Sequence, residues 1–400
     1  MAKTLKETMQ TEIAGRYDVV VVGGGIAGVS AALASARSGH TTLLIEKSVM
    51  LGGLATLGFI ILYEPLCDGK GRKIISGIAE ELLHESIRYG HSTLPEEWRE
   101  GGDFKNTAQR YETRFNPNGF VLALDELVRR EGIDVLFDSV FCRPVMKDGA
   151  CEGVAVETKG GRLGFEGRMV VDTTGDAEVL AKAGARCVNG DNWLSYYAYV
   201  TSLEDARKAV MEEDIRHAVR YRHWGANRLG KRAPEGSRKY TGRDARDISE
   251  FIMDGRRLAS SELAFADPKD KALVALPAMA QLRTVRRNEG YYVLKEGDAN
   301  KHFDDSVGSI SDFDRPGPLY EIPYRTLIAE GIHNIITAGR SIAAEGEAWE
   351  ITRVIPPCAL TGQAAGTAAA VAIEQGCSLE DVPIALLQKR LEASGVMIHF

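Results

Sequence analysis

Gly23, Gly25 and Gly28 form a Gly-x-Gly-x-x-Gly pattern directly after the apolar run Tyr17–Val22. In such a pattern the first glycine permits a tight turn, the second lets a pyrophosphate approach the backbone, and the third allows a helix to pack closely on the strand. The Ala-rich segment Val29–Ser38 predicts that helix, whose N-terminus would face the phosphates. The pattern therefore predicts a dinucleotide site, and a glycine-rich loop without a ligand is the alternative.

Glu46 ends a second apolar segment, Thr41–Ile45, and lies 18 residues after Gly28. An acidic side chain at the end of the second strand can accept hydrogen bonds from the adenosine ribose hydroxyl groups. Its negative charge would repel a 2′-phosphate, so NADP is disfavoured. Strand, glycines, helix, strand and acid thus occur in the order of a βαβ dinucleotide-binding unit.

The cysteines and histidines are scattered along the chain without a Cys-x-x-Cys pair or a metal-ligand spacing. We therefore expect neither a dithiol reductase nor a metal site, and the cysteines are predicted to be reduced thiols in the cytoplasm. His84, His302 and His333 stand alone and are expected to be ordinary structural histidines. The six cysteines are Cys67, Cys142, Cys151, Cys187, Cys358 and Cys377.

The charge balance argues against nucleic acid and anionic lipid as partners. Lys and Arg number 49 against 56 for Asp and Glu, which gives a formal net charge of -7. A basic stretch, Arg216–Arg246, is interleaved with aromatic side chains, but a solvated helical cap is favoured over a nucleic-acid patch. A small polar substrate or cofactor is the expected partner.

No segment has the pattern of a membrane anchor or a secretory leader. The longest apolar run, Val19–Ala36, contains several glycines and the polar Ser30, which indicates a buried strand followed by a packed helix. Met1–Ala14 is polar and charged, so it is predicted to be a short flexible tail. With 400 residues and 44% hydrophobic composition, the chain can form two interleaved domains.

Beyond the βαβ unit, hydrophobic patterns predict further helices and strands. Helices are expected at Gly77–Tyr89, Leu122–Gly132 and Pro357–Glu374. Strands are expected at 134–140, 153–158 and 164–171, and within His333–Arg340. There is no second glycine pattern between Arg340 and Phe400, so a separate NAD domain is not expected.

Several segments together resemble the FAD-dependent oxidoreductases, whose nucleotide fold is shared with fumarate reductases, ketosteroid dehydrogenases and thiazole synthases. The likeness spans almost the whole chain, and its two terminal parts are the most specific. The segments that carry it are Asp18–Gly28, Leu51–Thr56, Asp172–Ala177, Gln281–Tyr292, Asp305–Arg325 and Ala338–Gly366.

The resemblance implies an α/β fold with a Rossmann-like FAD-binding domain assembled from N-terminal and C-terminal segments. This domain has a parallel sheet with an added antiparallel β-meander, and an α+β cap or substrate domain is inserted into it. The expected boundaries are 16–58, 121–190 and 326–400 for the FAD-binding domain, 59–120 and 191–325 for the cap, and 1–15 for the tail.

The resemblance also implies which residues hold a non-covalent FAD. The glycines after the first strand would contact the pyrophosphate, Glu46 the ribose, the main chain near Phe141 the adenine, and a helix that begins near Cys358 the N1/O2 edge of the flavin. The full implied set is Gly23, Gly25, Ile26, Ala27, Gly28, Glu46, Lys47, Gly52, Gly53, Leu54, Ala55, Phe141, Thr174, Gly175, Asp176, Gly339, Arg340, Cys358, Thr361 and Gly362.

Candidates for the chemistry include three arginines, Arg283, Arg286 and Arg287, at spacings i, i+3 and i+4. On a helix or an extended cap element they would gather guanidinium groups around a carboxylate or a polyol. Surface ion pairing is the alternative. Cys358 at a helix N-terminus could have a lowered pKa, but a packing or flavin-contact role is favoured over that of a nucleophile.

Tyr324, Arg325 and a group of glutamates are further candidates. Tyr324 and Arg325 follow a strand-like segment and would border the flavin, with a structural role as the alternative. One of Glu345, Glu347 and Glu350 would act as the base if burial raised its pKa. Many relatives carry a histidine in the segment that Glu345 opens here, so a mechanism that needs this histidine is in doubt. The predicted catalytic set is Tyr324, Arg325, Arg283, Arg287 and Glu345.

The resemblance implies hydride transfer between flavin N5 and a small organic substrate, such as a sugar or another hydroxylated or unsaturated compound. The electron acceptor and the oligomeric state are not identified by the sequence. The alternative is a non-redox dinucleotide protein, such as a thiazole-synthase-like module that uses NAD.

Overall fold

A sheet built from both ends of the chain lies at the centre of the computed structural model, which describes residues 8–99, 110–227, 230, 233 and 235–400. The helices are α1 (Ile26–Arg37), α2 (Ile78–Ser86), α3 (Pro117–Arg130), α4 (Glu178–Lys182), α5 (Leu203–Met211), α6 (Ala245–Leu263), α7 (Gly346–Thr352), α8 (Ile355–Gln375) and α9 (Ile384–Ala393). The strands are β1 (Glu12–Val22), β2 (Thr42–Ile45), β3 (Leu62–Tyr63), β4 (Thr113–Arg114), β5 (Asp134–Leu136), β6 (Val140–Lys147), β7 (Ala150–Thr158), β8 (Gly161–Asp172), β9 (Cys187–Asn189), β10 (Ser195–Ser202), β11 (Arg220–Gly225), β12 (Lys271–Ala275), β13 (Arg286–Asn288), β14 (Ser306–Ser311), β15 (Leu319–Pro323) and β16 (Ile335–Thr337).

The main sheet has the order β5-β2-β1-β8-β7-β6, and β16 also pairs with β8. The pairs β2–β5, β1–β2, β1–β8 and β8–β16 are parallel, whereas β6, β7 and β8 form an antiparallel meander. The apolar run Val19–Val22 is completely buried, as expected for a strand covered on both faces. The predicted fold class, a parallel nucleotide-binding sheet with an added antiparallel meander, is confirmed.

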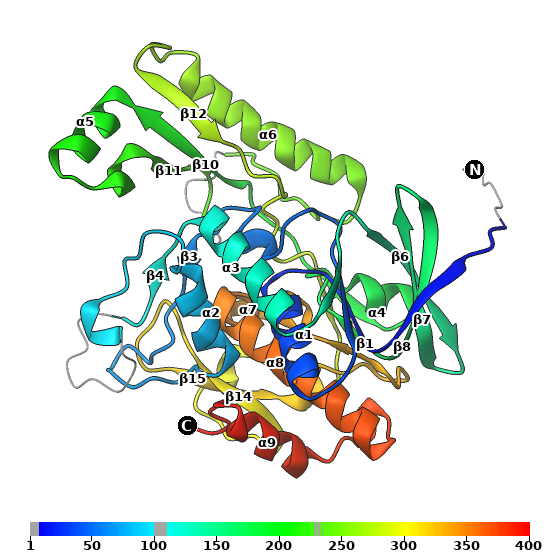
Figure 1. Ribbon diagram of the computed structural model, residues 1–400. Helices are drawn as coiled ribbons and strands as arrows, with labels where there is room; N and C mark the ends of the chain where they lie inside the picture. Colours follow the sequence, from blue (N-terminus) through cyan, green and yellow to red (C-terminus); the bar gives the residue numbers. More distant parts are fainter. Residues whose placement is uncertain (1–7, 100–109, 228–229, 231–232, 234) are drawn as a thin grey trace.

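Helices α1 and α8 lie side by side on one face of this sheet, although they are far apart in the sequence (Figure 1). The contact depends on small residues, because a Cβ on Gly362 or Gly366 would lie 2.2 Å from the carbonyl oxygen of Ala27 or Ala31. α8 is buried from Ile355 to Ile373. An N-terminal and a C-terminal segment therefore form one layer that neither could form alone.

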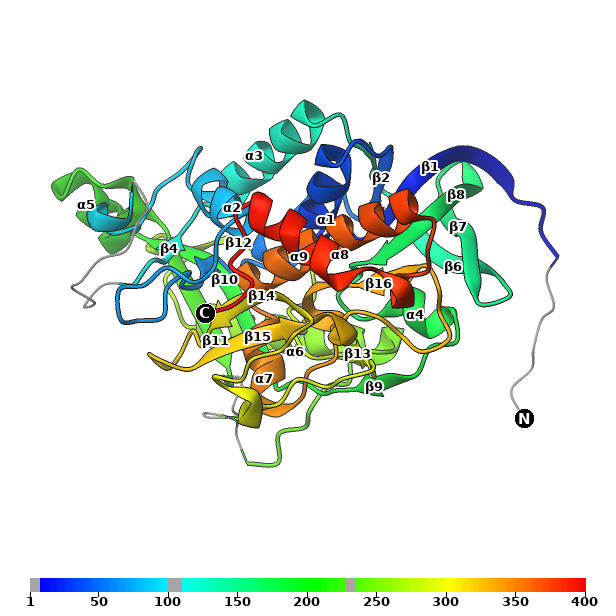
Figure 2. The same ribbon diagram turned by 90° about the horizontal axis from the view of Figure 1, so that it is seen from below.

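The segment 191–325, which was predicted to belong to a cap, contains an antiparallel sheet in the order β11-β10-β12, and helix α6 packs on this sheet. These elements project from one side of the molecule (Figure 1), whereas β14, β15 and α9 lie together on another side (Figure 2). Mixed helix and strand composition was expected for the cap. The helical structure predicted for Arg216–Arg246 is wrong at Arg220–Gly225, which forms β11.

The aromatic side chains of that basic stretch pack inside the cap. The rings of Tyr221 and His223 stack on Tyr197 of β10, with centroid distances of 4.9 and 4.3 Å. Stacked in this way, they are not free to bind nucleotide bases. Part of the stretch, together with residues 1–7 of the predicted tail and 100–109 of the predicted cap, lies outside the described residues.

Two local predictions need correction. β1 begins at Glu12, because Glu12 to Tyr17 extend the parallel ladder along β8, so this part of the predicted tail is strand. The single strand predicted at 134–140 is divided into β5 and β6. The chain turns at Asp138, whose φ is 51°, and the amide of Ser139 donates to the carbonyl oxygen of Glu46.

Among the described residues, no helix combines the length and apolar character needed to cross a bilayer.

Candidate functional site

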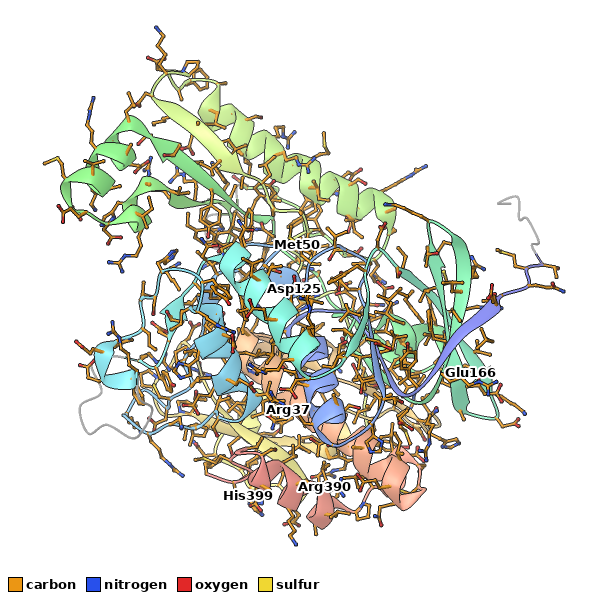
Figure 3. All side chains as sticks on the ribbon, viewed as in Figure 1. Arg37, Met50, Asp125, Glu166, Arg390 and His399 are labelled. Atoms are coloured by element: carbon orange, nitrogen blue, oxygen red, sulfur yellow. The ribbon has the colours of Figure 1, made fainter. Side chains whose placement is uncertain are left out.

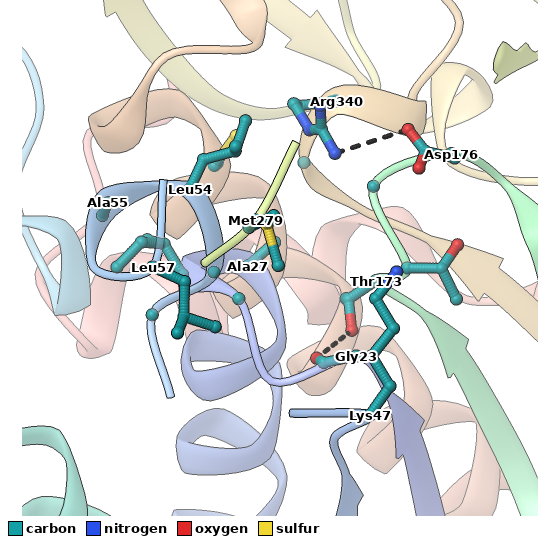
Figure 4. A pocket seen from close by; sticks show the side chains of 18 of the residues that line it. Gly23, Ala27, Lys47, Leu54, Ala55, Leu57, Thr173, Asp176, Met279 and Arg340 are labelled. Carbon is teal, nitrogen blue, oxygen red and sulfur yellow. Dashed lines mark hydrogen bonds and ion pairs between the residues drawn. The ribbon is translucent and has the colours of Figure 1, made fainter. Parts of the chain in front are cut away.

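A cleft with a volume of about 470 Å³ opens where β1, β2 and β8 end, next to the N-termini of α1 and α8. The carboxyl ends of parallel strands are the usual place for a ligand in such sheets. In Figure 4 the apolar side chains of Leu54 and Leu57 lie on one side of the cleft, and Asp176 and Lys47 lie on the other.

The glycine turn after β1 has the geometry that the sequence predicts. Gly23 has a φ of 107°, and a Cβ on Gly28 would lie 1.8 Å from the carbonyl oxygen of Gly23, which explains why both are glycine. Gly25 caps α1 without a side-chain hydrogen bond, and a Cβ there would meet nothing within 4 Å. The amide groups of the first turn of α1 are thus left to bind an anion in the cleft.

Glu46, which directly follows β2, is buried beside the glycine turn. Its Oε2 accepts a hydrogen bond from the Gly24 amide at 2.7 Å, and its Oε1 accepts one from the Ser48 amide at 2.7 Å. These bonds fix the carboxylate and leave further lone pairs for hydroxyl groups of a ligand. Phe141 and Ser139 line the cleft beside it, as an adenosine site would require.

We expect Glu46→Ala to weaken FAD binding by roughly 2–4 kcal/mol, because a charged acceptor for two ribose hydroxyl groups is lost. The amides of Gly24 and Ser48 also lose their acceptor, so the flavin-free protein should unfold at lower denaturant concentration. Titration with FAD, followed by flavin fluorescence, measures the first effect. Unchanged FAD affinity would remove Glu46 from the site.

A second glycine turn closes over the first. The Gly52 amide donates to the Gly24 carbonyl at 2.8 Å, and Gly52 forms a parallel bridge with Gly25. Gly52 and Gly53 have φ values of 97° and 57°, and the 3₁₀ turn Gly53–Ala55 follows. The positive φ angles make glycine necessary at both positions and bring the main chain to the wall of the cleft.

The loop after β8 supplies the polar wall. Arg340 reaches across it, with its Nη2 3.4 Å from Asp176 Oδ1 and its Nη1 donating to the carbonyl oxygen of Leu282 (Figure 4). Burial raises the pKa of Asp176, and the charges of Arg340 and Lys47 oppose that shift. The arginine thereby connects the nucleotide-binding sheet to the segment that carries Arg283.

Most residues predicted to hold the cofactor line this cleft. They are Gly23, Gly25, Ile26, Ala27, Glu46, Lys47, Gly52, Gly53, Leu54, Ala55, Phe141, Thr174, Gly175, Asp176, Gly339, Arg340 and Cys358. Gly28, Thr361 and Gly362 do not. Thr361 Oγ1 accepts a hydrogen bond from the Gly339 amide, and Gly362 packs against α1, so both support the cleft from behind.

Helix α8 begins at Ile355, whereas the sequence predicted a start near Cys358. Pro356 and Pro357 have no amide hydrogen, so the Ile355 amide is the donor exposed at the first turn. It donates to Glu64 Oε2 at 3.3 Å. Burial raises the pKa of the Cys358 thiol to about 12, which argues against a nucleophilic thiolate.

Glu64 is a buried carboxyl group that lines the cleft, and only 8% of its surface is exposed. Burial raises its pKa to about 7, and the Ile355 amide and the Arg353 charge counteract only part of that shift. A carboxyl group that titrates near neutral pH can accept or donate a proton under physiological conditions. This position is suited to acid–base chemistry.

Arg283 and Arg353 add positive charge to the same end. Burial and the Arg353 charge lower the pKa of Arg283. Arg353 pairs with Glu350 through its Nε at 2.9 Å, whereas Arg283 forms no ion pair with a described residue and lies over the ring of Tyr197. Two guanidinium groups thus share one acidic neighbour, Glu350, and this excess of positive charge favours an anion between them.

Both arginines also line a second cavity of about 210 Å³. Its wall includes Trp193, Ser195 and Lys239 from the cap side. The two guanidinium groups therefore lie between the large cleft and a smaller polar chamber.

The other predicted catalytic residues lie elsewhere. The Tyr324 hydroxyl is buried and donates to the Leu379 carbonyl oxygen, and Arg325 pairs with Asp305 at 2.9 Å. Arg287 and Glu345 approach each other at 3.8 Å, outside the cleft. We propose no catalytic role for these four residues.

The three arginines, predicted on a helix or an extended element, do not gather around one group. Arg286 and Arg287 lie in the strand β13, where successive side chains point to opposite faces. Arg286 donates to the Asp176 carbonyl oxygen, and Arg287 lies over the Trp349 ring. Arg283, which precedes the strand, lines the cleft.

Sequence reasoning missed Glu64 and Arg353. Each is the single charged residue in an apolar segment, Glu64 between Leu57 and Cys67 and Arg353 between Ile351 and Cys358. An isolated charge of this kind signals a buried group that needs a partner.

In the comparison with known proteins, a family model matches most of the chain. The model of the family "FAD dependent oxidoreductase" matches residues 18–244 and 237–391. A digeranylgeranylglycerophospholipid reductase from Methanoculleus marisnigri is 25% identical over 191 residues, which cover 42% of this chain and 41% of that protein. The chain thus aligns with less than half of this curated relative.

Two solved structures are similar to the chain at low identity. A geranylgeranyl bacteriochlorophyll reductase-like protein from Thermoplasma acidophilum is 14% identical with a TM-score of 0.48, over 95% of this chain and 83% of that chain. The p-nitrophenol 4-monooxygenase from Pseudomonas putida is 12% identical with a TM-score of 0.48, over 95% and 88%.

The cleft fits the cofactor of the matched family. An uncapped helix N-terminus, open space at Gly25 and a fixed acidic group at Glu46 are the features that bind a pyrophosphate and an adenosine ribose. With the family model matching most of its length, the chain belongs to the FAD-dependent oxidoreductases.

Proposed function

We propose that this enzyme transfers a hydride between FAD and a small anionic substrate, such as a hydroxylated or unsaturated organic acid. The observation that carries the proposal is the grouping of Glu64, Arg283 and Arg353 at one end of the cofactor cleft. Bound FAD supplies the hydride acceptor at N5. The rest of the reaction depends on the side chains of the chain itself.

In the oxidative direction, the substrate loses a hydride from carbon and a proton from its hydroxyl group. Glu64, as the carboxylate, accepts that proton, and in the reductive direction the carboxylic acid returns it. Arg283 and Arg353 hold the anionic group of the substrate and so orient the reacting carbon. The apolar residues Leu57 and Ile60 limit access of water to this end.

The smaller chamber gives the substrate a place next to the cofactor. Because Arg283 and Arg353 line both cavities, an anion held by them would extend into the chamber lined by Trp193 and Lys239. This arrangement supports a substrate that the nucleotide-binding sheet and the cap hold together.

We further propose that FAD is bound non-covalently and that the enzyme acts in the cytoplasm with a separate electron acceptor. Burial of the Cys358 thiol disfavours attack on the cofactor, which supports the first point. The family membership favours this function over the alternative of a non-redox module that uses NAD.

Screening of organic acids for bleaching of the bound flavin under anaerobic conditions tests this function. We expect Arg283→Met to raise the KM for the identified acid by about 10- to 100-fold, since a charge-assisted hydrogen bond contributes about 1.5–3 kcal/mol. Arg325→Met is a matched control, because Arg325 pairs with Asp305 outside the cleft. Equal effects of the two substitutions, or bleaching only by uncharged compounds, would contradict the proposal.

A further inference from the structure

His302, Glu321 and His399 meet on the side of the molecule away from the cap. Glu321 belongs to β15, and His302 lies ahead of β14. His399, labelled in Figure 3, lies in the C-terminal segment. One potential ligand atom from each side chain lies within 4.8 Å of the others. The sequence predicted an isolated His302 and no metal site, so this arrangement was not expected.

The distances from Glu321 to the two histidines are close to those between ligands of a tetrahedral metal ion. His399 Nδ1 lies 3.0 Å and His302 Nδ1 lies 3.5 Å from the same oxygen, Glu321 Oε1. Two ligands bound at 2.0–2.1 Å to tetrahedral zinc lie about 3.3–3.4 Å apart. Only small side-chain movements would place all three atoms at bonding distance.

Neighbouring groups hold the candidate ligands in orientation. The second oxygen of Glu321, Oε2, accepts a hydrogen bond from the Phe303 amide at 2.7 Å. His302 Nε2 lies 3.3 Å from Asp304 Oδ1, which leaves Nδ1 facing Glu321. Histidine ligands in metal sites generally donate their other ring nitrogen to a carboxylate or carbonyl in this way.

Burial shows that Glu321 needs a positive partner. Its side chain is 2% exposed, and no lysine or arginine pairs with it within the described part of the chain. A carboxyl group with so little access to water needs hydrogen-bond donors or a cation as partners, and the groups beside it are the Phe303 amide, His302 and His399. The side chains of His302 and His399 are 61% and 39% exposed, so a cation and a water molecule can approach from solvent.

We propose that His302, Glu321 and His399 bind a divalent transition-metal ion, represented by Zn²⁺, with water as the fourth ligand. Two imidazoles and one carboxylate suit zinc, whereas calcium and magnesium prefer oxygen ligands alone. The site is separate from the cofactor cleft and does not depend on the proposed reaction. Its function is to fasten the C-terminal segment to β15.

The contacts of that segment indicate what zinc would stabilise. The carbonyl oxygen of Ile398 accepts hydrogen bonds from the hydroxyl groups of Ser306 and Ser309, and the Ser309 amide donates to the Met397 carbonyl oxygen. Zinc would add a cross-link between His399 and Glu321 on this framework. Because the ion binds only the folded arrangement of these residues, it should stabilise the native state.

The test uses FAD-loaded, full-length protein that has been treated with a chelator and titrated calorimetrically with ZnCl₂. We expect one high-affinity ion per chain and a rise of several degrees in the midpoint of thermal unfolding. His302→Gln and His399→Gln should each lower zinc affinity by on the order of 100-fold, because each removes one of three protein ligands.

His217→Gln is the matched control, because His217 also lies beside two carboxylates, Glu212 and Asp214, but outside any such cluster of described residues. The site is supported if His217→Gln binds zinc as tightly as the parent while His302→Gln and His399→Gln bind it more weakly. Co²⁺ should give tetrahedral d–d absorption in the parent and lose it in His399→Gln. No zinc binding by the parent, or equal affinity in all variants, would overturn the proposal.

Discussion

Gly25→Val is expected to give a folded protein without flavin. In the structure a Cβ at Gly25 meets no atom within 4 Å, and the residue has an ordinary φ of -68°, so the backbone tolerates a side chain. The added atoms would project into the space in front of α1, where a pyrophosphate must approach the amide groups. We expect FAD affinity to fall by on the order of 100-fold or more, since overpacking costs 1–3 kcal/mol and the contacts to phosphate are lost as well.

The measurement is the ratio of flavin absorbance to protein after purification, together with circular dichroism of the same sample. Gly297→Val is the matched control, because a Cβ there also meets nothing within 4 Å and the residue is exposed far along the chain. Gly28→Val should behave differently and fail to fold, since its Cβ would lie 1.8 Å from the Gly23 carbonyl oxygen. Stoichiometric flavin in Gly25→Val would show that the turn does not bind the cofactor.

Glu64→Gln should slow flavin reduction by on the order of 100- to 1,000-fold while FAD remains bound, because general acid–base catalysis contributes effects of this size. With substrate oxidation, the parental rate should rise with pH as the carboxyl group ionises near its pKa of about 7. The glutamine variant should lack this rise. Stopped-flow bleaching by the substrate found in the screen, measured from about pH 5.5 to 8.5, separates the two profiles.

Stability provides a second readout of Glu64 that needs no substrate. The pKa of the carboxyl is about 7 in the folded protein and 4.5 ordinarily, so between these values the folded state holds a proton that the unfolded state has released. Stability of the flavin-free parent should therefore fall as pH rises through this window. The free energy of unfolding of Glu64→Gln, measured relative to that of the parent, should therefore rise by at most about 3 kcal/mol between pH 4.5 and 8.

Glu112→Gln is the control for the kinetic readout, because Glu112 does not line the cleft. It should leave the limiting rate of flavin reduction unchanged. Its pH profile should move toward lower pH, since the charge of Glu112 contributes to the raised pKa of Glu64. If Glu64→Gln reduced its flavin at the parental rate and with the parental pH profile, Glu64 would not be the acid–base group.

The cofactor cleft could be predicted from the sequence because its main features are local. Gly23, Gly25 and Gly28 act within one turn, and Glu46 follows at the end of the next strand, so spacing alone defines their arrangement. The first residue of α8 was harder to predict, because Pro356 and Pro357 are compatible with several helix starts.

The reactive end of the cleft could not be predicted in the same way. Glu64 and Arg353 approach the same wall from segments almost 300 residues apart, and only the tertiary fold brings Ile355 against Glu64. The zinc ligands Glu321 and His399 are likewise brought together by tertiary packing. Arg283 lines the cleft without the clustering with Arg286 and Arg287 from which it was predicted, because these two residues lie in β13 and have other partners.

The layer formed by α1 and α8 has a consequence for the order of events during synthesis. Gly339 and Ile355 form part of the wall of the cleft. The segment that contains them leaves the ribosome long after the glycine turn at Gly25. A nascent chain that has exposed only its first half holds the phosphate-binding turn but lacks the partner helix, and its apolar α1 stays uncovered. Cofactor capture is therefore expected to be a late, largely post-translational step that marks completion of the fold.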